Sequence, residues 1–145
     1  MKIGLILGQL SELEANLATR YRESGERYVD DHDVYHQCVS FAKKAESHVG
    51  KLASSRERYG AQNGAGSQVQ ARDGDDLGLL AVLRTLFLAA EELSITWVMA
   101  DQAAQAARDA ELLGVVHECH AEVELQAKWL TTRIKVAAPQ ALVTV

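Results

Sequence analysis

Apolar side chains recur along this chain at alternating spacings of three and four residues, in four separate segments. This spacing places them on one face of an α-helix. The four apolar seams are Ile3, Ile6, Leu10, Leu13, Leu17 and Tyr21; Val34, Cys38, Phe41, Ala45, His48 and Leu52; Leu79, Leu83, Leu86, Ala90, Leu93, Trp97 and Ala100; and Leu113, Val116, His120, Val123, Ala127, Leu130 and Ile134. The pattern predicts helices over about residues 3–24, 31–59, 76–107 and 110–137. Four such helices in 145 residues indicate a single all-α domain, a four-helix bundle over residues 1–145.

The residues between the seams favour particular helix ends. Gly25 can end the first helix in a left-handed conformation, and Asp30 with Asp31 can cap the second. Asp75 or Asp76 is placed to do the same for the third helix.

No glycine separates the third and fourth helices, so one very long helix is the alternative to two. The third seam, extended beyond Ala100, does not continue into the fourth, and Asp109 is a suitable cap for a new helix. A tight turn near residue 108 is therefore expected. The last helix should end near residue 137, and the apolar tail over residues 139–145, which contains the only proline, Pro139, could dock on a partner protein or on the bundle.

Residues 60–74 form a polar, glycine-rich connection that is unusually long for a helix bundle. Extended, it would cover most of the length of a neighbouring helix, because each residue spans about 3.3 Å. It could therefore cross the bundle, so that the second and third helices run parallel, or it could be a floppy hairpin loop in a simple up-down-up-down bundle. It lacks the Gly-Lys-Ser/Thr ending of a phosphate-binding loop.

The third predicted helix is apolar nearly all round. Its additional apolar residues are Leu80, Val82, Phe87, Leu88, Ile95, Val98 and Met99. A helix of this kind is buried on more than one side, and in a four-helix bundle the second buried face is most often a subunit interface. We therefore expect a homodimer formed through this helix.

Charge and composition exclude several classes of function. The net charge of −5 argues against a nucleic-acid-binding protein, because phosphate binding needs clustered Lys and Arg. No apolar run is long enough to span a membrane. Cys38 and Cys119 lie far apart within helical segments, which suits reduced thiols in a cytoplasmic protein.

The last predicted helix resembles the final bundle helix of ferritin-like proteins, especially bacterioferritins. The resemblance covers about 26 residues, from Asp109-Ala-Glu-Leu-Leu to Trp129-Leu-Thr-Thr-Arg-Ile134. It implies a ferritin-like bundle with a long crossover, in which the family holds two irons between a Glu from each of two helices and a Glu-x-x-His from each of the others. Here the family's last Glu and His fall on Val123 and Gln126, and Ala45 stands three residues before His48. The resemblance therefore implies the fold more than the activity.

Two seam histidines are the candidate site. If the loop crosses over, the second and fourth helices run antiparallel, which brings His48 and His120 to about the same level. Glu91 or Glu92 of the third helix reaches that level, Glu14 flanks the seam of the first helix, and His117 lies one turn before His120. Such a group would suit zinc or iron.

The alternative is structural. A histidine on an apolar seam is more often hydrogen-bonded to a carboxylate or a carbonyl than bound to metal. Cys38 and Cys119 distinguish the topologies, since they would share a level only in the simple up-and-down bundle.

These observations leave two hypotheses. The first is a ferritin-like protein with a degenerate His/Glu metal site and no organic cofactor. The second is a metal-free, dimeric helical adaptor, favoured by the apolar third helix and the apolar tail. A serine or cysteine hydrolase is disfavoured, because no nucleophile stands beside a base, and catalytic residues stay unassigned.

Overall fold

The computed structural model describes residues 1–72 and 76–144 and confirms an all-α four-helix bundle. The helices are α1 (Ile3–Arg27), α2 (His32–Tyr59), α3 (Leu79–Ala106) and α4 (Ala110–Leu142). α1 and α2 pack as one antiparallel pair and α3 and α4 as another, with α1 against α3 and a lighter contact between α2 and α4. No helix in the described ranges has both the length and the apolar character needed to cross a bilayer.

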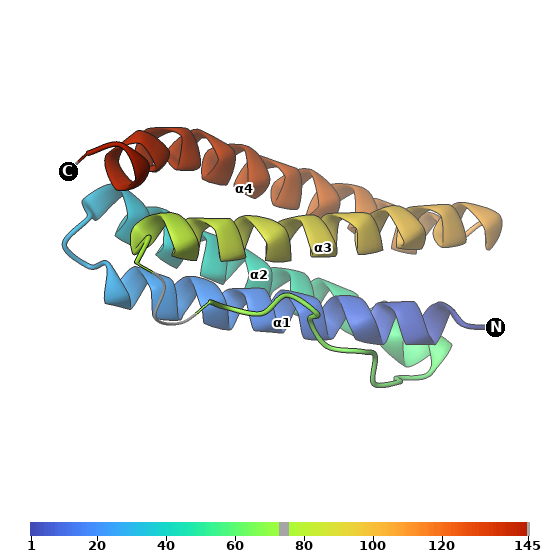
Figure 1. Cartoon of the computed structure of the whole chain (residues 1–145). Helices are drawn as coiled ribbons and strands as arrows, with labels where there is room; N and C mark the ends of the chain where they lie inside the picture. The colour runs from blue at the N-terminus through green and yellow to red at the C-terminus, as the bar shows by residue number, and fades with distance from the viewer. Residues whose placement is uncertain (73–75, 145) are drawn as a thin grey trace.

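The glycine-rich connection crosses the bundle. In Figure 1 the green trace leaves the end of α2 and runs back along α1, so that α3 starts at the opposite end of the bundle. α2 and α3 are therefore parallel, and α2 and α4 antiparallel. The prediction of a long crossover is confirmed, and the simple up-down-up-down arrangement is wrong.

Small residues let this connection lie directly on α1. A Cβ at Gly8 would come within 1.8 Å of the Gln62 carbonyl oxygen, and one at Gly64 within 2.3 Å of the Gln9 backbone. Side chains then fix the later part of the loop, since Arg20 donates to the Val69 carbonyl at 2.5 Å and Glu92 accepts from the Gln68 N–H at 2.7 Å. The connection thus ties α1 to α3.

Two predicted helix ends are confirmed. Asp31 accepts a hydrogen bond from the Val34 N–H at 3.2 Å, and Asp109 accepts one from the Leu112 N–H at 3.0 Å. The turn between α3 and α4 contains Arg108, whose φ of 55° is left-handed. A tight turn at residue 108 therefore replaces a single long helix.

Two other helix ends differ from the prediction. Gly25 does not end α1, because it is buried where a Cβ would come within 3.0 Å of the Cys38 Cβ, and tight packing on α2 carries the helix on to Arg27. The N-cap of α3 is Gly78, with no side-chain hydrogen bond, so Asp76 does not cap it; Asp75 lies outside the described residues.

Pro139 does not end α4. The helix continues to Leu142, with the Val143 N–H bonded to the Pro139 carbonyl at 3.0 Å. Proline removes only its own donor, and one bond lost in the final turn is tolerated. The prediction of a tail from residue 139 is therefore wrong for residues 139–142, whose side chains are exposed rather than docked on the bundle.

Candidate functional site

The core contains a buried carboxylate and a buried imidazole in direct contact. Glu14 of α1 is 0% exposed and His48 of α2 is 2% exposed. His48 Nδ1 lies 2.5 Å from Glu14 Oε2. Glu14, which the sequence placed only at the flank of its seam, is thus the direct partner of His48.

Trp97 and Cys119 complete this level of the core. The other carboxylate oxygen, Glu14 Oε1, and the indole Nε1 of Trp97 are both buried without a hydrogen bond of normal geometry. Burial raises the pKa of Glu14, while His48 and, to a lesser degree, the nearby Trp97 N–H lower it. We call these four residues, one from each helix, the polar core level.

The two buried thiols, Cys119 at this level and Cys38 nearer one end of the bundle, are poor nucleophiles. Burial raises the pKa of Cys119 to about 12, with Glu14 adding to the effect, and burial alone raises the pKa of Cys38 to about 12. A thiol in this state is not ionised at neutral pH. Neither cysteine is therefore suited to covalent catalysis or to ready metal binding.

A second buried polar contact lies about two helical turns further along α1. The Tyr21 hydroxyl donates to Gln126 Oε1 at 2.9 Å, whereas Gln126 Nε2 is buried without a partner. Burial is the largest cause that raises the pKa of Tyr21. Gln126 occupies the position at which the ferritin-like resemblance has its histidine, so a neutral amide hydrogen-bonded to Tyr21 stands there instead.

His120 lies at the level of His48 but in different surroundings. The ion pairs Lys44–Glu122 at 2.8 Å and Lys51–Glu118 at 2.5 Å fix the register of α2 against α4. They place positions 48 and 120 at similar heights. His120 Nε2, however, lies 2.9 Å from Ser94 Oγ of α3 and 3.2 Å from Glu124 Oε1, at the edge of the bundle.

The periodicity of α4 explains why His120 missed the core. The fully buried side chains of this helix are Leu112, Val116, Cys119, Val123, Gln126 and Leu130. The predicted seam shares Val116, Val123 and Leu130 with this set, but it took Leu113, His120 and Ala127 where the structure buries the preceding residue of each. A shift of one residue rotates a side chain by about 100° around a helix.

The remaining candidate ligands lie outside the core. The His117 side chain is 60% exposed, with its Nε2 3.6 Å from Asp101 Oδ2. Glu91 is exposed on the outer side of α3. Of the five predicted ligands, the structure brings only Glu14 and His48 together, and within residues 1–72 and 76–144 no three His, Cys, Asp or Glu side chains form a group that could hold a metal ion.

The cysteines agree with the crossover topology. Cys38 packs beside Gly25 near one end of the bundle, whereas Cys119 packs at the polar core level. The antiparallel register of α2 and α4 places them about ten residues, or roughly 15 Å, apart along the axis. They do not share a level, as expected for a bundle with a crossover.

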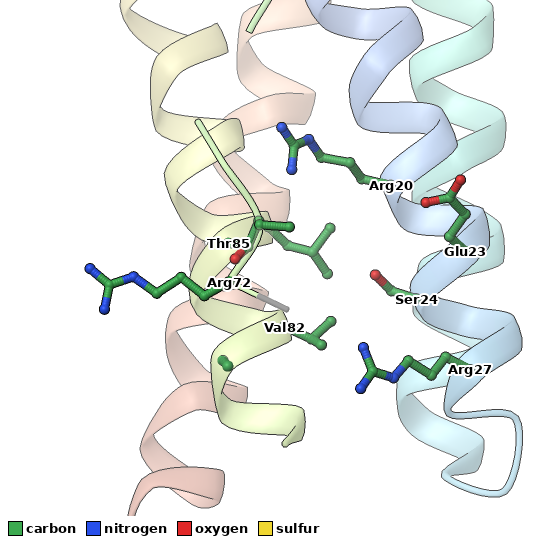
Figure 2. A pocket seen from close by; sticks show the side chains of 10 residues that line it. Arg20, Glu23, Ser24, Arg27, Arg72, Val82 and Thr85 are labelled. Carbon is green, nitrogen blue, oxygen red and sulfur yellow. The ribbon is translucent and has the colours of Figure 1, made fainter. Parts of the chain in front are cut away.

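A separate cavity of about 240 Å³ lies between the end of α1, the crossover connection and the start of α3. Figure 2 shows Arg20 and Arg27 reaching from α1 toward α3 with Ser24 between them, while Arg72 extends away on the other side. Arg20 is already bonded to Asn16 and to the Val69 carbonyl. With Glu23 also lining it, the cavity carries mixed charge and mainly anchors the connection.

Comparison with known proteins adds no relative. The chain matches no family model, no curated protein and no solved structure. The arrangement itself must therefore carry the functional argument. The polar core level offers one hydrogen-bonded carboxylate–imidazole pair, and Val123 and Gln126, at the positions where ferritin-like proteins have their last Glu and His, supply neither a carboxylate nor an imidazole.

Proposed function

We propose that this chain is a self-associating helical interaction protein whose subunits pair through α3. One observation carries the proposal: the outer face of α3 exposes a row of large apolar side chains. They are Leu88 at 43%, Ile95 at 59%, Val98 at 40% and Met99 at 55% exposure. Each would be stabilised by removal from water, at roughly 25 cal/mol per Å².

The apolar surface continues on both neighbouring helices. Leu5 of α1 is 42% exposed and lines a hollow with Met99. Toward the other end, Leu142 of α4 lines a groove together with Leu88 and Ile95. Contiguous apolar patches of this kind favour protein interfaces over free surface. The exposed end of α4 extends the surface and suits a further protein partner.

The fold supports an interaction role better than catalysis. The only buried carboxylate–imidazole contact of the described residues, Glu14 with His48, lies in the core, and neither residue lines the surface cavities along α1, α3 and α4. A substrate would need access to one of these groups. A cytoplasmic location goes with this proposal, since Cys38 and Cys119 are both free thiols.

Sedimentation equilibrium of the wild type and Ile95→Glu tests the proposal. The wild type should be dimeric at micromolar concentration, and Ile95→Glu should weaken the dimer at least about tenfold, as for a central interface residue. Leu125→Glu is the matched control, because Leu125 is 58% exposed but lies on α4. A monomeric wild type, or equal loss in both variants, would contradict the proposal.

A second candidate is a single zinc or iron ion at Glu14 and His48. It is favoured by the unpartnered Glu14 Oε1, which is a free oxygen donor beside an imidazole. Metal analysis of the untagged protein and of His48→Ala, with the exposed His117→Ala as control, tests it. Stoichiometric metal that only His48→Ala loses would support this candidate; equal metal content in all three proteins would remove it.

A further inference from the structure

The outer face of α3 carries two charged side chains among its apolar ones. Arg84 lies four residues before Leu88, and Glu91 lies three residues after it. Both are exposed, and neither has an ion-pair partner within the described residues. Other charged side chains of the bundle do pair across helices, as Arg58 does with Asp109 at 2.8 Å.

The two charges lie on one line within the exposed face of α3, with Val98 on one side of it and Leu88 on the other. Seven residues make almost two full helical turns, so Arg84 and Glu91 are separated by only about 20° around the helix axis and by about 10.5 Å along it. Leu88 lies between them along the axis and is rotated by about 40–60° to one side of their line. Opposite charges therefore flank an exposed leucine at nearly equal distances.

From this placement we infer that α3 pairs with α3 of a second copy in an antiparallel arrangement, with the two-fold axis beside Leu88. This axis is perpendicular to the helices. It reverses the direction of the second helix, and residues on one side of the exposed face in one copy meet residues on the same side in the other. Arg84 of each copy then faces Glu91 of the other, and Leu88 faces Leu88. The inference rests on the proposed self-association and specifies its geometry.

The apolar residues fit the same register. Ile95 lies seven residues after Leu88, and Ala81 lies seven residues before it. In the antiparallel pair each Ile95 meets Ala81 of the second copy, where a small side chain leaves room for a large one. A groove of about 940 Å³ lined by Ala81, Leu88 and Ile95 lies along this part of α3.

A parallel pair would be self-repelling. It would place Arg84 against Arg84 and Glu91 against Glu91, and like charges across an interface oppose association. The sign pattern along α3 thus favours the antiparallel partner and opposes the parallel one.

Charge reversal tests the register by sedimentation equilibrium. Arg84→Glu and Glu91→Arg should each weaken the dimer about tenfold, because each puts two like-charged pairs across the interface. The double variant Arg84→Glu with Glu91→Arg should bind within about threefold of the wild type, since both pairs are restored with reversed sign. Lys43→Glu on α2 makes the same change of net charge as Arg84→Glu and should leave association unchanged.

Thiol crosslinking gives a second measurement. Leu88→Cys should crosslink efficiently with a short bismaleimide, whereas Gln102→Cys, at the far end of the same face, should not, because its counterpart lies far away in an antiparallel pair. A dimer lost in Ile95→Glu but indifferent to charge reversal, or crosslinked at Gln102→Cys, would overturn this register and leave the proposed pairing through α3 intact. A monomeric wild type would remove both.

Discussion

The polar core level and the outer face of α3 depart from the usual distribution of side chains in opposite directions. Glu14 and His48 place a carboxylate and an imidazole at 0% and 2% exposure, whereas Ile95 and Met99 place large apolar groups at 59% and 55%. The polar groups inside largely satisfy one another, at 2.5 Å. The apolar groups outside contact nothing in the bundle that removes them from water.

The buried polar pair can be explained within one chain, whereas the exposed apolar row cannot. A buried ion-pair or hydrogen-bonded pair seldom adds stability relative to an apolar pair of similar size, but it penalises any packing that separates its members. We therefore expect the contact between Glu14 and His48 to set the register of α1 on α2. The apolar row of α3 has no such partner within one chain, and its explanation lies in a second molecule.

The largest effect is expected from breaking the buried pair. His48→Leu leaves Glu14 in an apolar interior with neither oxygen bonded, which should lower the free energy of unfolding by about 3–5 kcal/mol. The double variant Glu14→Leu with His48→Leu should regain most of that loss. Urea denaturation of the variants measures both. If His48→Leu were as stable as the wild type, the pair would not act as a register device.

A smaller effect is expected where the crossover lies on α1. Gly8→Ala adds a Cβ that meets the Gln62 carbonyl oxygen at 1.8 Å, so the connection must shift, at a cost of about 1–3 kcal/mol. Gly114→Ala is the control: nothing lies within 4 Å of a Cβ there, and an alanine should stabilise α4 by up to about 1 kcal/mol. Limited proteolysis of residues 60–72 measures the shift. Equal protection in both variants would show that the connection does not depend on this contact.

The pH dependence of the unfolding free energy reports on the buried carboxyl group of Glu14. Burial raises the pKa of Glu14 above its unfolded value, so the folded state binds the proton more readily. This group therefore stabilises the fold least at high pH, and its contribution falls as the pH rises from about 4.3 through the folded pKa. The difference in unfolding free energy between the wild type and Glu14→Gln should decrease over that range. A difference independent of pH would contradict the raised pKa.

The smallest effect on the fold is expected on the outer face of α3. Ile95→Glu should change the unfolding free energy of the isolated subunit by no more than about 0.5 kcal/mol, because the side chain is already mostly in water. Denaturation at concentrations below the dimer dissociation constant measures this. Combined with a large loss of association, this result would show that the outer face of α3 contributes to association and not to the stability of the subunit. A large loss of subunit stability would show instead that the row packs within the bundle.

Sequence periodicity was sufficient for the helices and for most of the core. The spacing of apolar residues predicted all four helices, and local chemistry identified the caps Asp31 and Asp109. The sequence prediction was wrong at the ends of α1 and α4. Packing on α2 carries α1 past Gly25, and the loss of one hydrogen bond at Pro139 is not enough to end α4. The spacing Gly4-x-x-x-Gly8 was the available signal that a backbone lies against α1.

The candidate site was only partly predictable. The sequence identified His48 and suggested Glu14 as one of two possible partners, but it also grouped them with His117, His120 and Glu91. The predicted seam of α4 took His120 where the structure buries Cys119, and this one-residue error wrongly placed His120 in the core. Tyr21 stood on the predicted seam of the first helix, but Gln126 lay one residue off the predicted seam of the fourth, so the periodicity did not indicate their buried contact.

By itself the sequence determined four helices, a long polar connection and a third helix with apolar residues on both sides. Those properties follow from local periodicity, which each helix carries independently of the others. The tertiary structure decided that the connection crosses the bundle, that Glu14 rather than Glu91 meets His48, and which apolar residues of α3 stay in water. These outcomes depend on the relative direction and rotation of packed helices, and no single segment encodes either quantity.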